Sequence, residues 1–165
     1  MMRVYVPATL AMLQQLIADR VIHARSGTAF AVTPALREAY AHGDDEELAE
    51  VALGEAALAS LRLLAGGVGD LPPRRVVVVA DADDVTVRPD LDDAVVRLAG
   101  PIEHDHIVAV YVDNAAAEEA VLAAIEVIDA ADLGDEDAEL TVGDAQDHDL
   151  AWYAPQELPF LLELL

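Results

Sequence analysis

Three aspartates follow the most hydrophobic short run of the sequence. Asp81, Asp83 and Asp84 come directly after Val76–Ala80, which is four valines and an alanine. Carboxylates at the C-terminal end of a strand can converge on one Mg²⁺ ion, and one of them can attack a phosphoryl group. The pattern therefore supports the hypothesis of a Mg²⁺-dependent phosphoester hydrolase, with Asp81 as nucleophile and Asp83 and Asp84 as acid or metal ligands.

The Asp81-Ala82-Asp83 motif resembles the first motif of haloacid-dehalogenase-type phosphatases and the Asp-x-Asp of topoisomerase-primase domains. The phosphatase type also needs a cation, usually a lysine, but the chain has no lysine, and only Arg88 or Arg97 could substitute. The topoisomerase-primase type needs a glutamate on an earlier strand, and no strand predicted before Val76 contains one. We therefore favour the interpretation that these aspartates are solvated residues where the strand passes into a loop, and we keep the Mg²⁺-dependent hydrolase as the alternative.

A second candidate group lies near the C-terminus, where the only tryptophan adjoins a tyrosine. Trp152 and Tyr153 are followed by Gln156 and Glu157 at the start of a predicted helix. Aromatic rings with polar tips suit ligand or partner contacts, although core aromatics would show the same pattern. Tyr5 joins this group if the first and last strands are neighbours. We predict a binding site formed by these five residues.

Two histidine motifs mix metal-ligand types at short spacing, His104-Asp105-His106 and Asp147-His148-Asp149. A His-x-His pair on a strand places both imidazoles on one face, an arrangement that a zinc site can use. A third ligand is not identifiable in the sequence. We therefore interpret both motifs as polar turns and predict no cofactor outside the Mg²⁺ alternative.

The charge balance bears on the partners of the chain. The formal net charge is −23, all nine basic residues are arginines, and cysteine is absent. This balance repels phosphate backbones, so we expect no nucleic-acid binding. The same field attracts basic partners or cations, or simply keeps the surface soluble. Without cysteine, disulfides, thiol catalysis and cysteine-ligated metals are excluded.

The N-terminal residues lack the basic-then-apolar pattern of a signal peptide, and no stretch of membrane-spanning length is free of charge. We therefore expect a cytoplasmic protein without a membrane span.

The elements that position these residues follow from hydrophobic patterning and helix caps. The unbroken valine run predicts a central strand over 75–80 that is buried on both faces. Further strands are expected at 3–6, 28–32, 85–87, 94–98, 106–112, 140–142 and 150–153, and helices at 10–19, 34–40, 45–65, 115–131 and from 155. Residues 132–137 read as an acidic loop. The alternation predicts a single α/β or α+β domain over 1–165, with a mixed sheet that contains parallel pairs and is covered by helices.

The longest predicted helix, 45–65, has apolar residues on two nearly opposite faces. One face carries Leu48, Val51, Ala52, Ala59 and Leu63, and the other carries Leu53, Ala57, Leu61 and Leu64. A second helix of the same domain is expected to cover the other face. A homodimer through this helix or the C-terminal helix is the alternative.

Three segments carry a resemblance to a known family: Met2–Pro7 (MRVYVP), Ala31–Glu38 (AVTPALRE) and Trp152–Pro159 (WYAPQELP). The chain resembles a family of short uncharacterised actinobacterial proteins over nearly its whole length. The resemblance implies a bacterial, cytoplasmic setting and carries no activity, ligand or catalytic residue. Together the observations favour an acidic binding or interaction module without catalytic activity, whose protein partner the sequence does not identify.

Overall fold

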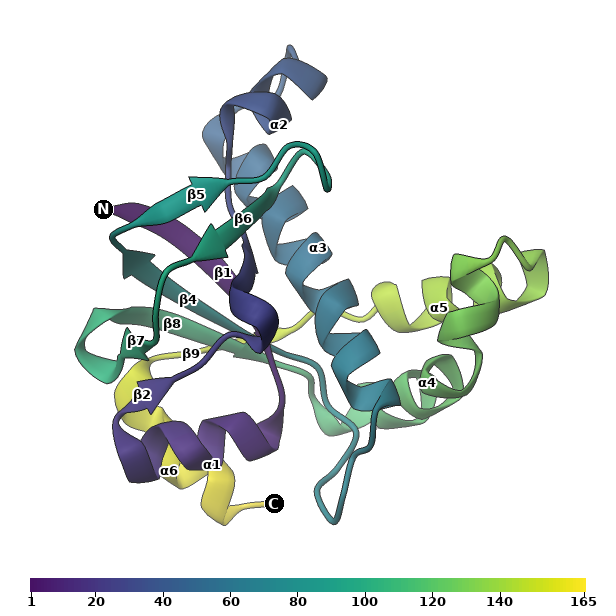
Figure 1. The fold of residues 1–165 in the computed structure, drawn as a ribbon. Helices are drawn as coiled ribbons and strands as arrows, with labels where there is room; N and C mark the ends of the chain where they lie inside the picture. Colours follow the sequence, from purple (N-terminus) through teal and green to yellow (C-terminus); the bar gives the residue numbers. More distant parts are fainter.

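The computed structural model describes all 165 residues and builds them around one sheet of seven strands, in the order β5-β6-β3-β1-β4-β8-β9 (Figure 1). A separate ribbon pairs β2 with β7. The strands are β1 (Met2–Ala8), β2 (Val21–Ile22), β3 (Thr28–Phe30), β4 (Val76–Ala82), β5 (Val85–Val87), β6 (Val95–Leu98), β7 (Ile102–Glu103), β8 (Ile107–Val112) and β9 (Ala151–Tyr153). The α-helices are α1 (Leu10–Asp19), α2 (Pro34–Ala39), α3 (Asp45–Ala65), α4 (Glu118–Asp132), α5 (Glu136–Gln146) and α6 (Leu158–Glu163).

Every pair of neighbouring strands in the large sheet is antiparallel, so the predicted parallel pairs are wrong. The helix α3 does connect two strands of the same direction, β3 and β4, but β1 lies between them and runs the other way. Alternation of helices and strands along a sequence does not reveal whether another strand lies between the two strands that a helix connects. The prediction of a helix-covered sheet is confirmed, in its α+β form.

The prediction of a central valine strand is confirmed. β4 pairs with β1 on one side and β8 on the other, and residues 76–80 are all buried. Because side chains alternate along a strand, Val76 and Val78 enter one apolar cluster and Val77 and Val79 enter another. The valine run therefore lies between two cores, as a strand covered on both faces requires.

Helices cover the two faces of the sheet to different extents. On one, the α1/α6 face, Leu10, Leu13 and Leu16 of α1 and Leu158 and Leu161 of α6 join the largest cluster. On the other, the α3 face, Leu48, Ala52 and Ala56 of α3 pack mainly on β1, β3 and β4. The strands β8 and β9 continue the sheet away from α3 (Figure 1).

The long helix α3 has the predicted bounds, and Asp44 caps it by accepting a hydrogen bond from the Glu47 N–H at 2.8 Å. Its buried positions form one continuous stripe rather than two opposite faces: Leu48, Ala52, Ala56, Ala57, Ser60, Leu61 and Leu64. The first half of the stripe meets the sheet, and the end of it packs with Val121 and Ile128 of α4. The predicted second covering helix is therefore confirmed, while the homodimer remains a prediction.

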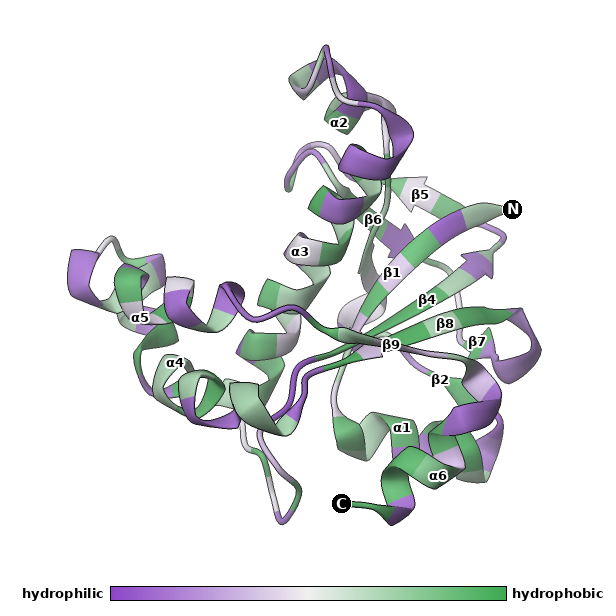
Figure 2. Ribbon diagram, turned by 180° about the vertical axis from the view of Figure 1, so that it is seen from behind, coloured by the Kyte–Doolittle hydropathy of each residue, from purple (hydrophilic) through white to green (hydrophobic).

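The helices α4 and α5 form an arm beside α3, which Figures 1 and 2 both show projecting from the sheet. The predicted strand over 140–142 is wrong, because α5 spans it, and α5 also takes the end of the predicted acidic loop. Asp135 caps α5 by accepting from the Ala138 N–H, and Ala138, Val142 and Ala145 are buried at helical spacing. These small residues give a weak apolar pattern, which explains the error.

No helix of the chain has both the length and the apolar character needed to cross a bilayer. Even α3, the longest helix, begins with three acidic residues and carries Arg62 in its last turn.

Candidate functional site

The five predicted binding residues do not converge on one site. Tyr5 lies on β1 within the cluster of the α3 face, and two strands separate β1 from β9. Tyr111 of β8 packs against the same cluster, and Trp152 of β9 is its direct cross-strand partner. Opposite residues of an antiparallel pair project to the same face, so Tyr111 and Trp152 lie side by side on the α3 face. Tyr5 lies on the same face but is opposite Val79, two residues along β4 from the Tyr111 partner Val77. Burial raises the pKa of the Tyr5 phenol, and the nearby Tyr111 raises it further.

The other three members of the predicted group lie elsewhere. Tyr153 packs against the α1/α6 face, as the alternation along β9 dictates. Gln156 and Glu157 are exposed in the 3₁₀ turn Pro155–Glu157. The Glu157 Oε1 accepts a hydrogen bond from the Ala154 N–H at 2.9 Å, so its role is to cap this turn. Of the predicted group, only Tyr5 and Trp152 face the same side of the sheet.

Asp81, near the end of β4, and Asp83 and Asp84, which follow the strand, line one hollow of about 390 Å³ together with Glu103 and His106. Asp81 is held by Arg3, whose Nε and Nη2 donate to its carboxylate at 2.9 and 3.3 Å. This pairing holds the pKa of Asp81 below its ordinary value. Asp83 lies 3.7 Å from the N-terminal amine, and Asp84 occupies a turn with φ of 54°. No three carboxylate or histidine side chains in the chain lie close enough together to hold a metal ion.

The histidine motifs lie in turns, as interpreted. His104 and His106 belong to the 3₁₀ turn His104–His106, and the His104 Nδ1 lies 3.1 Å from the Arg20 Nη2. Burial lowers the pKa of His104, and the Arg20 charge lowers it further. His148 lies in the segment between α5 and β9.

A cleft of about 630 Å³ lies on the α3 face, and we term it the α3–β9 groove. One wall is α3 between Glu50 and Leu58, and the other is the segment from Gln146 to Leu150 that leads into β9. Arg75, which directly precedes β4, lines the base of the groove. Leu150 also packs against the cluster of the α3 face, so the groove is continuous with that face of the sheet.

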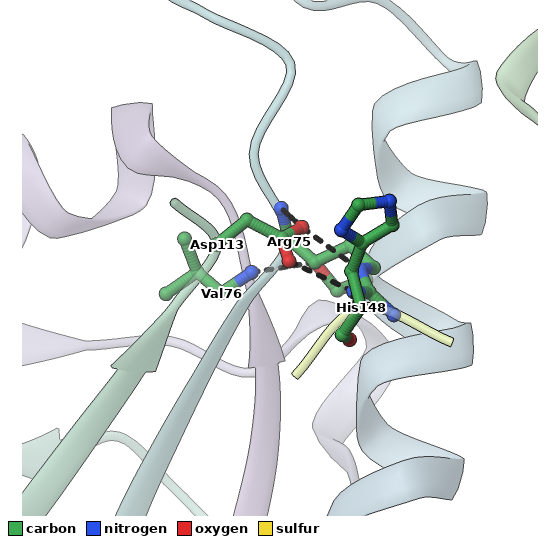
Figure 3. A network of polar contacts seen from close by, with 5 residues as sticks. Arg75, Val76, Asp113 and His148 are labelled. Atoms are coloured by element: carbon green, nitrogen blue, oxygen red, sulfur yellow. Dashed lines mark hydrogen bonds and ion pairs between the residues drawn. The ribbon is translucent and has the colours of Figure 1, made fainter. Parts of the chain in front are cut away.

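A buried ion pair fixes the base of the groove (Figure 3). The Arg75 Nε and Nη2 each donate to a different oxygen of the Asp113 carboxylate at 2.8 Å, and the Arg75 N–H also donates to it. The side chains are 3% and 0% exposed, so the charges compensate each other out of contact with water. The Arg75 Nη2 also donates to the His148 carbonyl at 2.8 Å, which ties the outer wall to the sheet.

Gly54 lies at the centre of the helical wall. At 3.6 residues per turn, Glu50, Ala57 and Leu58 flank it on the same side of α3. A Cβ atom added to Gly54 would meet no atom within 4 Å, so the space in front of it is open. Glycine destabilises a helix interior by about 0.5–1 kcal/mol relative to alanine. Packing within the chain does not explain why position 54 is a glycine, since the Cβ of an alanine would meet no atom there.

The groove is electrostatically negative. Glu50, Glu55 and Asp149 line it, while the Asp113 carboxylate neutralises the Arg75 charge. Burial raises the pKa of the Glu55 carboxyl, and the Asp92 charge raises it further. Carboxylates beside apolar side chains such as Val51 and Leu150 suit a ligand that has a positive charge and an apolar part.

Sequence analysis did not identify Arg75, Asp113 or Gly54 as site residues. One signal was present: Arg75 directly precedes one buried strand and Asp113 directly follows another. In an antiparallel pair the start of one strand meets the end of its neighbour, so a prediction that β4 and β8 pair in this way would have joined the two charges.

Comparison with known proteins identifies a family but no activity. Neither a curated protein nor a solved structure matches the chain. The model of a family of unknown function, DUF6912, matches residues 2–162, which is nearly the whole length. The chain therefore belongs to the DUF6912 family of unknown function.

Proposed function

We propose that this protein is a binding module whose ligand is positively charged and lies in the α3–β9 groove. The observation that carries the proposal is the open wall at Gly54, flanked by the Glu50, Glu55 and Asp149 carboxylates. The largest pocket with convergent polar groups and a perturbed carboxyl pKa is the expected place for a ligand. The net charge of −23 adds a long-range attraction for cations.

The experiment fills the groove without disturbing the fold. In Gly54→Leu the new side chain occupies open space, whereas Gly143→Leu places the same side chain on α5, where an added Cβ also meets no atom within 4 Å. Spermidine and arginine amide serve as cationic probes, with glutamate as the anionic control. Calorimetric titration and thermal unfolding measure binding, because a ligand that binds only the native state raises its stability.

The wild type and Gly143→Leu are expected to bind the cations, and Gly54→Leu is expected to bind them at least about tenfold more weakly. Equal stabilisation of all three proteins would mean that the cations only relieve acidic repulsion, and it would overturn the proposal.

A second candidate function, the Mg²⁺-dependent phosphoester hydrolase, has one observation in its favour: Asp81, Asp83 and Asp84 line the same hollow. The Arg3 guanidinium donates hydrogen bonds to both oxygens of the Asp81 carboxylate, and these bonds would have to break before Asp81 could act as nucleophile. Stabilisation by Mg²⁺ and aryl phosphate hydrolysis, both lost in Asp81→Asn, would support this function. Asp90→Asn is the matched control, since Asp90 also accepts two hydrogen bonds from one arginine, Arg88. Equal behaviour of the two variants would contradict it.

A further inference from the structure

The outer edge of β9 is free. β9 is the last strand of the sheet order, so no strand pairs with its far side. An unpaired edge presents backbone N–H and C=O groups, to which an extended chain can add as a further strand. None of the three residues of β9 is a lysine or a proline, so these two means of blocking an edge are absent, and its short length limits an added strand to a few backbone hydrogen bonds.

A large aromatic side chain stands on this edge. Trp152 is 56% exposed, although its ring can contribute strongly to stability when buried. It lies beside Tyr111 on the α3 face, in the part of that face that α3 does not cover. Exposed tryptophans that become buried on association are frequent anchors of protein interfaces.

The exposed tryptophan and the groove are adjacent. Leu150 lines the groove, packs against the cluster of the α3 face and directly precedes β9, and Trp152 follows two residues later on the same face. Alternate side chains of an extended segment are spaced about 7 Å apart, which matches this spacing along β9. A segment that pairs with β9 would therefore place one side chain over Trp152 and the next of the same face at the groove.

The charge of the surface selects the occupant. Arg3, Arg37, Arg62, Arg74, Arg75 and Arg88 each pair with a carboxylate of the chain. The remaining carboxylates are in large excess over the other arginines, and Glu50 and Asp149 stand at the groove itself. A guanidinium or ammonium group is attracted both to these carboxylates and to the face of an indole ring.

We propose that β9 receives an extended, arginine- or lysine-containing segment of a partner protein as an eighth strand. One cation of the segment stacks on Trp152, and the next side chain of the same face enters the α3–β9 groove. This inference rests on the proposed function, because it names the occupant of the same groove. It adds two features that a small cation lacks: backbone pairing with β9 and the contact with Trp152.

Capped seven-residue peptides that alternate arginine and valine test the inference. A second peptide replaces arginine by glutamate, and a third keeps the arginines but is N-methylated at alternate backbone amides, which removes donors without changing charge. Calorimetry gives the affinities, and amide chemical shifts locate the contact. The wild type is expected to bind the first peptide with shifts at 150–153. The N-methylated peptide and Trp152→Ala are each expected to weaken binding by about tenfold or more.

Phe160→Ala is the control variant, since Phe160 is a 69% exposed aromatic residue on α6, which covers the opposite face of the sheet. It is expected to bind as the wild type does. Equal affinity for the N-methylated peptide, or for Trp152→Ala, would overturn strand addition at β9. If spermidine binds in a Gly54-dependent way but no peptide binds more tightly than spermidine, this inference is wrong and the proposed function stands. If neither class of probe binds, both are wrong.

Discussion

The two faces of the sheet show how one set of strands can serve stability on one side and recognition on the other. On the α1/α6 face, the helices α1 and α6 and the ribbon of β2 and β7 cover alternate residues of β1, β4 and β8. On the α3 face, one helix covers β1, β3 and β4, and the uncovered part keeps Trp152 exposed and a groove open. Alternate side chains of β4 contribute to both faces, so the valine run does not distinguish them. The difference arises from where the helices lie.

The polar groups of the two faces differ in the same way. None of the buried polar residues belongs to α1 or α6, whereas the base of the α3 face holds the Arg75–Asp113 pair and Ser60. The Ser60 Oγ donates to the Ala8 carbonyl at 2.7 Å and accepts from the Val76 N–H at 3.0 Å. These groups satisfy backbone atoms where β1 ends and β4 begins. Directional hydrogen bonds therefore fix the α3 face at this end of the sheet.

The largest expected effect comes from breaking the ion pair beneath the groove. Asp113→Ala leaves the Arg75 charge buried without its partner, which is expected to lower the free energy of unfolding by about 3–5 kcal/mol. Denaturant titration measures the change. Asp132→Ala is the control, because Asp132 pairs with Arg62 in the same two-bond geometry but is 43% exposed. Its loss is expected to cost less than about 1 kcal/mol. Similar losses in the two variants would show that burial does not distinguish the pairs.

The same substitution made on each face compares them directly. Leu13→Ala empties a fully buried position of α1 and is expected to cost about 2–5 kcal/mol, since a cavity adds to the lost transfer free energy. Leu150→Ala removes a half-buried side chain at the groove, where water can enter, and is expected to cost about 1 kcal/mol. Denaturant titration of both variants gives the two values. A cost at Leu150 as large as that at Leu13 would mean that the groove is closed in solution.

Local patterns predicted the elements well because local chemistry decides them. Asp44, Thr9 and Thr33 cap three helices through the backbone N–H three residues on, and the bounds of α1 and α3 were predicted as found. The error over 140–142 arose where alanine and one valine provide the buried positions, so that the helical pattern is weak. Strand direction also escaped prediction, because it depends on whether a connection skips a strand.

The candidate site was less predictable because it depends on how distant segments meet. Trp152 was predicted to be a binding residue from its type, and the structure leaves it exposed beside Tyr111. Tyr153 lies on the other face, as the alternation of side chains along the predicted strand 150–153 would have indicated. Arg75 and Asp113 are 38 residues apart and meet only because β4 and β8 pair antiparallel. The open space at Gly54 results from the arrangement of α3 and the 146–150 segment, which no local pattern encodes.

A glycine substitution probes the open wall with a smaller effect of opposite sign. Gly54→Ala is expected to raise the free energy of unfolding by about 0.5–1 kcal/mol, because alanine is the better helix residue and its Cβ meets no atom. Gly27→Ala is expected to lower it, since Gly27 has φ of +70° and an added Cβ would lie 3.0 Å from the Leu98 carbonyl oxygen. Thermal and denaturant unfolding measure both changes. Destabilisation by Gly54→Ala would mean that the wall is occupied.

The smallest expected effect is the pH dependence of Glu55 at the groove. Burial raises the pKa of this carboxyl above its ordinary value of 4.5, so its ionised form is less favourable in the folded protein than in the unfolded one. The wild type therefore loses stability as pH rises from the ordinary pKa through the folded one, and Glu55→Gln avoids that loss. The variant is expected to melt at a higher temperature at neutral pH, and this advantage should vanish below about pH 4, where the carboxyl is protonated in both states. Asp81→Asn is expected to have the opposite effect and to melt at a lower temperature at neutral pH. Arg3 lowers the pKa of Asp81 below 3.8, so the ionised carboxylate stabilises the fold at neutral pH, and this stabilisation is lost only as pH falls through the lowered pKa. Melting curves in which both variants changed the melting temperature in the same direction at neutral pH would contradict the contrast between Glu55, which is desolvated at the groove, and Asp81, which is paired near the end of β4.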